Sequence, residues 1–244
     1  LTWMVHFTNK DAQDTPILEQ IRTLDWPDAL TGHGGECLLR LTQGGNGGRD
    51  DYKPSQRMIN GGDGIRSDMG SSDTLPFFNL QHGDRGVIGA IGRSGSWLAA
   101  YTPPPPDPAI CLDAGMPTTH LLLHAGETIR TPSVLLMPYQ GCDYYDSQNL
   151  WRRLAFAYFS PRDAQGRRID VPLTVGSWGE ESIDKKMALI NAIHDAKMPM
   201  EVYWIDAGWY GDATKAWTEN RGSWSPANKD YPNGLGPLGD LLRS

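Results

Sequence analysis

The stretch from residue 171 to residue 209 constrains the fold more than any other part of the chain. It starts with a short apolar run, "VPLTVGSW", continues with "EESIDKKMALINAIHDAK", and ends with a second apolar run, "MEVYWIDAGW". The middle segment predicts a helix, with acidic residues in its first turn, where the helix dipole favours them. Four of its residues recur at helical spacing: Ile183, Met187, Ile190 and His194. A strand–helix–strand segment of this size predicts two parallel strands joined by a right-handed crossover.

The chain has a different pattern before residue 147. Short β-prone runs such as "ECLLRLT" and "GVIGAIG" alternate with turn-forming clusters such as "GGNGGRDD", and a helical period is nearly absent. Many short strands separated by turns predict an antiparallel β-sandwich over residues 1–146. The proline-rich segment "TPPPPDP", residues 102–108, is predicted to be a stiff extended loop, because proline cannot pair in the interior of a sheet.

A helical segment is expected between these two regions. "DSQNLWRRLAFAYFSP" follows the last β-prone run; Asp146 or Ser147 is a suitable N-cap, and Pro161 closes the helix. The predicted organisation is therefore a β domain over 1–146, a helical linker over 147–170 and an α/β region over 171–244.

Composition excludes several classes of function. The net charge is −7 with scattered Lys and Arg, which argues against nucleic acid or an anionic membrane surface as a partner. No apolar run approaches the roughly 20 residues that span a bilayer. The three cysteines form no CxxC pattern.

In "HLLLH", His120 and His124 lie on a predicted strand, about 13 Å apart at ~3.3 Å per residue, so they are interpreted as structural. We predict no metal and no cofactor.

Asp206 is the first candidate for a functional residue. The apolar run from Val202 to Ile205 stops at this single carboxylate, and Gly208 and Trp209 follow closely. An Asx turn leading into the glycine is one explanation, and from the residues alone it is the more common one. A carboxylate that faces a ligand at the carboxyl end of a parallel strand is the other.

Six motifs in order along the chain resemble glycoside hydrolase family 36, the melibiase-type α-galactosidases. Three fall in the β-rich region and three in the α/β region: "FTNKDAQDTPILEQIRTLD", "LPFFNLQHGDRGVIGAIGRSGSW", "HAGETIRTPSVLLMPYQG", "SWGEE", "WIDAGW" and "RGSWSPANKDYPNGLGPL". The resemblance implies that residues 171–244 form the first two βα units of a (β/α)8 catalytic barrel. It also implies a retaining, double-displacement cleavage of terminal α-galactosides.

The resemblance also assigns binding roles. Asp206 would accept hydrogen bonds from sugar hydroxyls, and Trp178, Trp209 and Trp224 would form the walls of the substrate pocket, since a sugar offers hydroxyls and an apolar face. The sequence departs from the family pattern at three positions. Ala207 stands where a second aspartate is usual, and Gly176 and Gly179 replace the usual Asn and Glu, which leaves the identity of the sugar open.

The catalytic residues are not expected in this chain. Both family carboxylates belong to later barrel strands, so we expect a fragment, inactive alone, that needs the rest of its own barrel. Galactosyl transfer on the same scaffold is an alternative activity, and a non-catalytic carbohydrate-binding or structural module is an alternative class. The expected ligand is an oligosaccharide or glycoside. The sequence leaves open the compartment and whether the protein forms a homo-oligomer.

Overall fold

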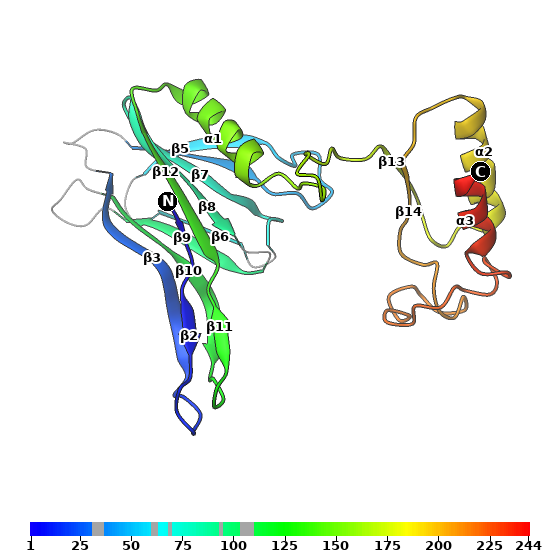
Figure 1. Cartoon of the computed structure of the whole chain (residues 1–244), viewed down its shortest axis with the longest axis horizontal. Coiled ribbons are helices and arrows are strands. Elements are labelled where there is room, and N and C mark those ends of the chain that lie inside the picture. Colours follow the sequence, from blue (N-terminus) through cyan, green and yellow to red (C-terminus); the bar gives the residue numbers. More distant parts are fainter. Residues whose placement is uncertain (31–36, 60–62, 68–69, 93–94, 103–109) are drawn as a thin grey trace. The chain divides into compact units, whose positions relative to one another are not determined.

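The chain divides into two compact units, Leu1–Phe159 and Ser160–Ser244, in the computed structural model drawn in Figure 1. The structure describes residues 1–30, 37–59, 63–67, 70–92, 95–102 and 110–244. Most of the predicted proline-rich loop, residues 103–108, lies outside the described residues.

The first unit is built from antiparallel strands, as the sequence pattern predicts. A six-stranded sheet has the order β1-β12-β8-β7-β4-β5, a four-stranded sheet has the order β3-β10-β9-β6, and β2 pairs with β11. The strands are β1 (Thr2–Trp3), β2 (His6–Thr8), β3 (Leu18–Leu30), β4 (Leu38–Gln43), β5 (Pro54–Met58), β6 (Asp63–Ser67), β7 (Thr74–His82), β8 (Arg85–Gly92), β9 (Trp97–Thr102), β10 (Ile110–Leu121), β11 (Thr128–Arg130) and β12 (Ser133–Gln140).

One hydrophobic cluster holds the two larger sheets together. Leu39, Phe78 and Leu80 enter it from the six-stranded sheet, and Trp97 and Leu112 enter it from the four-stranded sheet. All of these side chains are buried. Period-two alternation explains why Phe78 and Leu80 both face this cluster, because they lie two residues apart and so share one face of β7.

Helix α1 (Tyr144–Tyr158) packs on the other face of the six-stranded sheet. The Phe77 ring lies 5.5 Å from the Trp151 ring of α1. The Asn79 side chain donates to Ser147 Oγ (3.1 Å), and its oxygen accepts from the Tyr139 hydroxyl (2.8 Å). These contacts tie α1 to the first unit.

The helix begins earlier than predicted, so the predicted caps, Asp146 and Ser147, are wrong. Asp143 is the N-cap, and its carboxylate accepts from the Asp146 N–H at 2.8 Å. Asp143 is able to cap because its backbone is extended just before the first helical residue. Ser147 lies instead inside the first turn and is buried. The helix ends at Tyr158, before Pro161, as predicted.

The second unit contains the predicted strand–helix–strand segment. Its elements are β13 (Thr174–Ser177), α2 (Ile183–Asp195), β14 (Val202–Ile205) and α3 (Gly236–Arg243). The two strands are parallel, as predicted, with Ser177 opposite Ile205. A second hydrophobic cluster forms around Ile183, Ile190, Tyr231 and Leu238.

One residue of the predicted apolar face of α2 is misplaced. His194 is exposed, and Ile193 is buried in its place. The two positions differ by one residue, or about 100° around the helix, so either is compatible with the spacing from Ile190. Burial of the fully apolar side chain is favoured because the imidazole would need a partner in the core.

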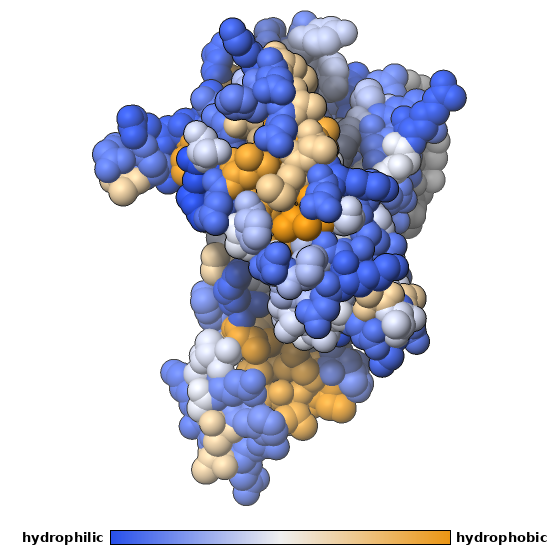
Figure 2. All heavy atoms as spheres, turned by 90° about the vertical axis from the view of Figure 1, so that its right-hand side faces the viewer, coloured by the Kyte–Doolittle hydropathy of each residue, from blue (hydrophilic) through white to orange (hydrophobic). Residues whose placement is uncertain are grey.

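Apolar side chains also remain at the surface. The face drawn in Figure 2 shows several hydrophobic patches among hydrophilic side chains. In the described part of the chain, no helix is both long and apolar enough to cross a membrane.

Candidate functional site

The carboxyl ends of β13 and β14 lie side by side and carry two of the candidate residues. The parallel ladder runs one step past the strands, because the Asp206 N–H donates to the Ser177 carbonyl at 2.9 Å. Trp178 and Asp206 therefore leave the sheet at neighbouring positions of the same edge. This is the juxtaposition expected if both residues serve one site.

The two faces of this strand pair differ in burial. On one face, Tyr203 and Ile205 pack against the hydrophobic cluster of the helices. Trp204, which alternates with them, is 61% exposed. Asp206 continues the alternation on the Trp204 side and is exposed, and Trp178, beyond Ser177 on β13, is 39% exposed. An exposed carboxylate and two exposed indole rings thus belong to the face of the sheet that the helices do not cover.

Gly179 explains how the two strand ends approach so closely. Its N–H donates to the Ala207 carbonyl at 3.0 Å. A Cβ on Gly179 would lie 2.3 Å from that same oxygen, which no real side chain tolerates. Gly208 lies opposite, with a φ of +95° that favours glycine. At residue 179, where the sequence departs from the family pattern, this packing itself requires glycine.

Asp206 takes part in its own turn and also keeps a free acceptor. Its Oδ1 accepts from the Ala207 N–H at 2.7 Å. The other carboxylate oxygen has no hydrogen-bond partner among the described residues. The local turn and an outward-facing acceptor therefore coexist, and the turn contact holds the carboxylate in place.

The four candidate tryptophan and aspartate residues do not form a single cluster. The Trp178 indole N–H donates to Glu180 Oε2 at 3.0 Å, and its ring is nearly perpendicular to the Trp217 ring, with centroids 6.1 Å apart. Trp209 packs against the buried cluster of the second unit and contacts Trp224, with centroids 6.4 Å apart. Trp224 itself is 66% exposed. The structure thus gives Trp178 and Trp224 exposed surface, whereas Trp209 contributes to packing.

Lys186 is the main residue that the sequence analysis missed. Its side chain, on α2, has no exposed surface. The ammonium donates to Ser177 Oγ (3.1 Å) and to the Trp178 carbonyl, and Glu181 is its ion-pair partner at 4.0 Å. Burial is the largest cause that lowers the Lys186 pKa. Lys186 thereby holds the backbone of the turn that presents Trp178.

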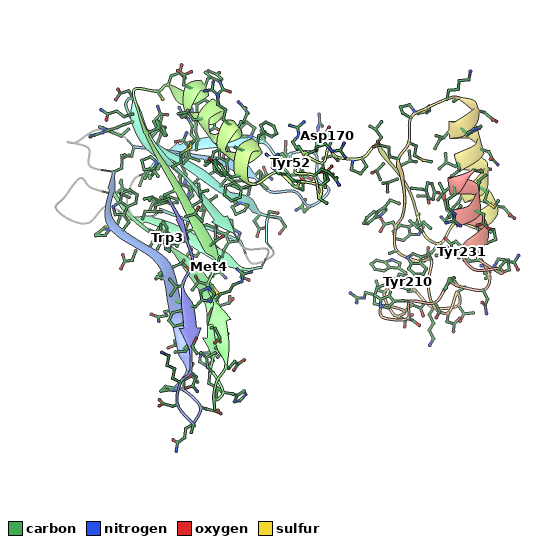
Figure 3. The ribbon with its side chains drawn as sticks, in the orientation of Figure 1. Trp3, Met4, Tyr52, Asp170, Tyr210 and Tyr231 are labelled. Atoms are coloured by element: carbon green, nitrogen blue, oxygen red, sulfur yellow. The ribbon has the colours of Figure 1, made fainter. Side chains whose placement is uncertain are left out.

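Two tyrosines complete this support. The Tyr203 hydroxyl donates to Ser177 Oγ at 2.7 Å, and the Tyr231 hydroxyl donates to the Gly179 carbonyl at 2.5 Å. Burial raises the Tyr231 pKa. Figure 3 labels Tyr231 and Tyr210, both in the second unit. The backbone from Ser177 to Gly179 is therefore held by three buried or half-buried polar side chains. The spacing of Lys186 from Ile183 and Ile190 was the sequence signal for its burial.

A cavity of about 340 Å³ opens in the loops that follow β13 and β14. Glu180 comes from the first loop, and Asp212, Lys215 and Trp217 come from the second. Glu180 and Trp217 also contact Trp178, so the cavity adjoins the candidate site.

The residues that the structure describes contain no group of three or more His, Cys, Asp or Glu side chains arranged to hold a metal. His120 and His124, considered above as a pair, are both exposed and have separate partners. His120 Nδ1 lies 3.1 Å from Glu19, and His124 Nδ1 lies 2.9 Å from Asp14.

Comparison with solved structures identifies the fold. An α-galactosidase from Lactobacillus brevis matches 98% of this chain with a TM-score of 0.72 and 20% identity. The GH36 α-galactosidase AgaA from Geobacillus stearothermophilus matches 98% with a TM-score of 0.73 and 19% identity. The galactosidase domain of the α-galactosidase-sucrose kinase AgaSK matches 99% with a TM-score of 0.75 and 17% identity. The chain has the fold of part of a GH36 α-galactosidase.

The match covers only part of each GH36 protein. The chain spans about a third of their length, 32% of the first, 33% of the second and 34% of the third. No family model matches the sequence. No curated protein matches it either. The likeness therefore rests on the three-dimensional arrangement, in which the antiparallel sheets of the first unit are aligned with a β-rich part of the GH36 proteins.

Proposed function

We propose that this chain is part of an α-galactosidase-type glycoside hydrolase. The observation that carries the proposal is the neighbouring position of Asp206 and Trp178 just past the carboxyl ends of two parallel strands, in a chain that shares the GH36 fold over 98% of its length. Two related crystal structures, of AgaA variants, contain raffinose and stachyose. An oligosaccharide that ends in an α-galactoside is accordingly the proposed substrate.

The second unit supplies part of the proposed active site. We assign β13, α2, β14 and α3 to the first two βα units of a (β/α)8 barrel within residues 171–244. Active sites of such barrels lie at the carboxyl ends of the strands, which is where Trp178 and Asp206 are located. Residues 1–146 are then the N-terminal β-sandwich and residues 147–170 the connection.

Asp206 and Trp178 have complementary roles in this proposal. The free oxygen of Asp206 accepts a hydrogen bond from a sugar hydroxyl, and the fixed carboxylate pays no further ordering cost. The exposed indole of Trp178, and that of Trp204 on the same face, cover the apolar side of the sugar ring. The Ala207 side chain offers no acceptor, so the single carboxylate that follows β14, that of Asp206, selects the sugar.

The chemistry itself requires residues outside this chain. Retaining glycosidases place a nucleophile and an acid/base carboxyl about 5–5.5 Å apart across the glycosidic bond. We assign both groups to later barrel strands. The residues described above bind and orient the glycoside. Galactosyl transfer would use the same binding residues, with a sugar hydroxyl replacing water.

The test is the hydrolysis of p-nitrophenyl α-galactoside by the full-length protein, with wild type, Asp206→Asn and a matched control. Asp195→Asn is the control because Asp195 is an exposed carboxylate at the far end of α2. Asp206→Asn should weaken galactose binding by about 1–3 kcal/mol, the range for a buried polar group that loses its partner, and leave the circular dichroism spectrum unchanged. Equal affinities for Asp206→Asn and Asp195→Asn would remove Asp206 from the site. A wild-type protein that binds galactosides but never cleaves them would indicate a binding module instead.

A further inference from the structure

The loop between β4 and β5 contains an Asn–Gly pair in open surroundings. Asn46 and Gly47 are both exposed, and a Cβ on Gly47 would meet nothing within 4 Å. Gly47 has a φ of +88°, a conformation that favours glycine. The asparagine side chain therefore has free space beside the peptide that follows it. Figure 3 labels Tyr52, near the end of this loop.

The Asn46 side chain folds forward along the chain. A Cβ on Gly48 would be 3.2 Å from Asn46 Oδ1, so the side-chain amide lies over the peptides that follow it. In any asparagine the side-chain carbon Cγ can form a bond to the next peptide nitrogen, which closes a succinimide ring. Here that nitrogen belongs to Gly47, which has no side chain to obstruct the attack.

One carboxylate binds the peptide nitrogens of this turn. Asp51 Oδ2 accepts from the Gly47 N–H at 2.9 Å and from the Gly48 N–H at 3.1 Å. Asp51 Oδ1 accepts from the Asn46 N–H at 3.3 Å. The nitrogen that would attack Asn46 therefore already directs its proton at a base. General base catalysis requires this geometry, in which the base lies within hydrogen-bond reach of the proton that it removes.

The second described Asn–Gly pair, Asn233–Gly234, has a different partner. The Gly234 N–H donates to the Tyr231 carbonyl at 2.9 Å. A peptide carbonyl is a far weaker base than a carboxylate and does not remove this proton. Asn233 is exposed as well, so exposure does not distinguish the two pairs. A third pair, Asn60–Gly61, lies outside the described residues.

We propose that Asn46 is a site of spontaneous deamidation assisted by Asp51. The Gly47 nitrogen bonds to Asn46 Cγ while its proton passes to the Asp51 carboxylate. The bond between Cγ and the side-chain nitrogen then breaks, and that nitrogen takes the proton from Asp51 and leaves as ammonia. Water opens the succinimide and gives aspartate or isoaspartate. The new carboxylate lies beside that of Asp51, and the repulsion between them weakens the turn that Asp51 holds.

A carboxylate base gives the reaction a characteristic dependence on pH. Deamidation without such a base depends on hydroxide, so its rate rises with pH. Catalysis by an ionised carboxylate is nearly constant from about pH 5 to about pH 7. The other charged groups of the loop are Arg49, Asp50 and Lys53, and Asp73 lies on the segment that accepts from the Gly44 N–H. Asp50 is 3.6 Å from Lys53, so its carboxylate is directed to a cation.

The experiment follows deamidation of the folded full-length protein by mass spectrometry of tryptic peptides. Trypsin separates the three Asn–Gly pairs into the peptides 41–49, 58–66 and 230–243. Asp51→Asn removes the base. Asp50→Asn removes a carboxylate of the same loop whose partner is Lys53, and it is the matched control. Neither substitution creates a new Asn–Gly pair.

Asn46 should deamidate faster than Asn233 in the folded wild type, at a rate that changes little from about pH 5 to about pH 7. We expect Asp51→Asn to slow the reaction of Asn46 about 10- to 100-fold, up to the lower end of what a positioned general base contributes, and to restore the rise with pH. Asp50→Asn should stay within about twofold of wild type, because an exposed charge acts weakly through water. In urea, all three proteins should react at one hydroxide-dependent rate.

Two results would overturn the proposal. The first is that Asn46 reacts as fast or faster in Asp51→Asn, since the carboxylate would then protect the peptide and not activate it. The second is that the folded wild type keeps Asn46 intact while the unfolded protein loses it, since the turn would then be a barrier to the attack. Neither result depends on the proposed glycosidase activity.

Discussion

Replacing Lys186 tests whether a buried cation holds the turn that presents Trp178. Lys186→Met keeps a similar length and an apolar stem but cannot donate a hydrogen bond. The Trp178 carbonyl then loses its side-chain donor, whereas Ser177 Oγ keeps the hydroxyl of Tyr203. The Trp178 carbonyl keeps only the Glu181 N–H, at a long 3.4 Å, and Glu181 loses its ion-pair partner.

The magnitude follows from that one acceptor. A buried acceptor left without any partner costs about 1–3 kcal/mol, and the Trp178 carbonyl approaches that state because its remaining bond is long. Removing an ammonium group that has no exposed surface relieves a desolvation cost, which offsets part of the loss. We expect Lys186→Met to lower the free energy of opening of this region by about 1–2 kcal/mol, the lower part of that range. Lys186→Ala also removes the three methylenes beyond Cβ, which methionine replaces with groups of similar size, and should lower it by about 2.4 kcal/mol more, at ~0.8 kcal/mol each.

Native-state hydrogen exchange is the assay, because it reports local opening in a protein with more than one unit. The amides of Gly179 and Asp206 are suitable probes, since both donate across the two strand ends. They should exchange roughly 5- to 30-fold faster in Lys186→Met than in wild type. Lys185→Met, an exposed neighbour on α2, should leave both rates within about twofold. Identical rates in Lys186→Met and Lys185→Met would show that the ammonium contributes nothing to the turn.

The same lysine predicts a pH dependence with a definite sign. In the folded protein, burial lowers the Lys186 pKa below its usual value of 10.5. Between the lowered pKa and 10.5, the unfolded state therefore binds more protons than the folded state. Stability therefore increases with pH across that window. The Gly179 and Asp206 amides should open less readily as the pH rises, after correction for intrinsic exchange, and this trend should vanish in Lys186→Met.

Two further predictions concern a glycine and a histidine. Gly179→Ala should destabilise the strand ends by about 1–3 kcal/mol, because its Cβ would press against backbone oxygens. Gly176→Ala should be tolerated, because the nearest contact of its Cβ is 4.0 Å away. Similar thermal denaturation of the two variants would contradict the packing argument. The hydrogen bond with Asp14 raises the pKa of His124 above 6.5. The stabilisation by this hydrogen bond is therefore complete below pH 6.5 and is lost as the pH rises through the raised pKa of His124. A proton NMR titration should show the His124 pKa decrease in Asp14→Asn and stay unchanged in Asp11→Asn.

Local patterns alone were sufficient for much of the fold. The short β-prone runs separated by turns before residue 147 predicted antiparallel strands, and the strand–helix–strand pattern predicted that β13 and β14 are parallel, because a short helical crossover permits no other arrangement. The neighbouring positions of Trp178 and Asp206 followed from the same argument. These features depend on residues close together in the chain.

Only the tertiary structure decided which side chains serve the site and which support it. The helical period admitted both Ile193 and His194 to the buried face, and in the tertiary structure Ile193 is the buried one. A lysine on a predicted helix is normally exposed, yet Lys186 is buried because the Trp178 carbonyl and Ser177 Oγ, brought to it by the β13–α2 turn, satisfy its ammonium. Gly179 had the appearance of a lost functional residue until the Ala207 carbonyl was found where its Cβ would lie. The helical spacing of Lys186 from Ile183 and Ile190 is consistent with burial, but the spacing does not supply the partners of its ammonium. Each of these outcomes depends on contacts between different elements, which the local pattern of one element does not contain.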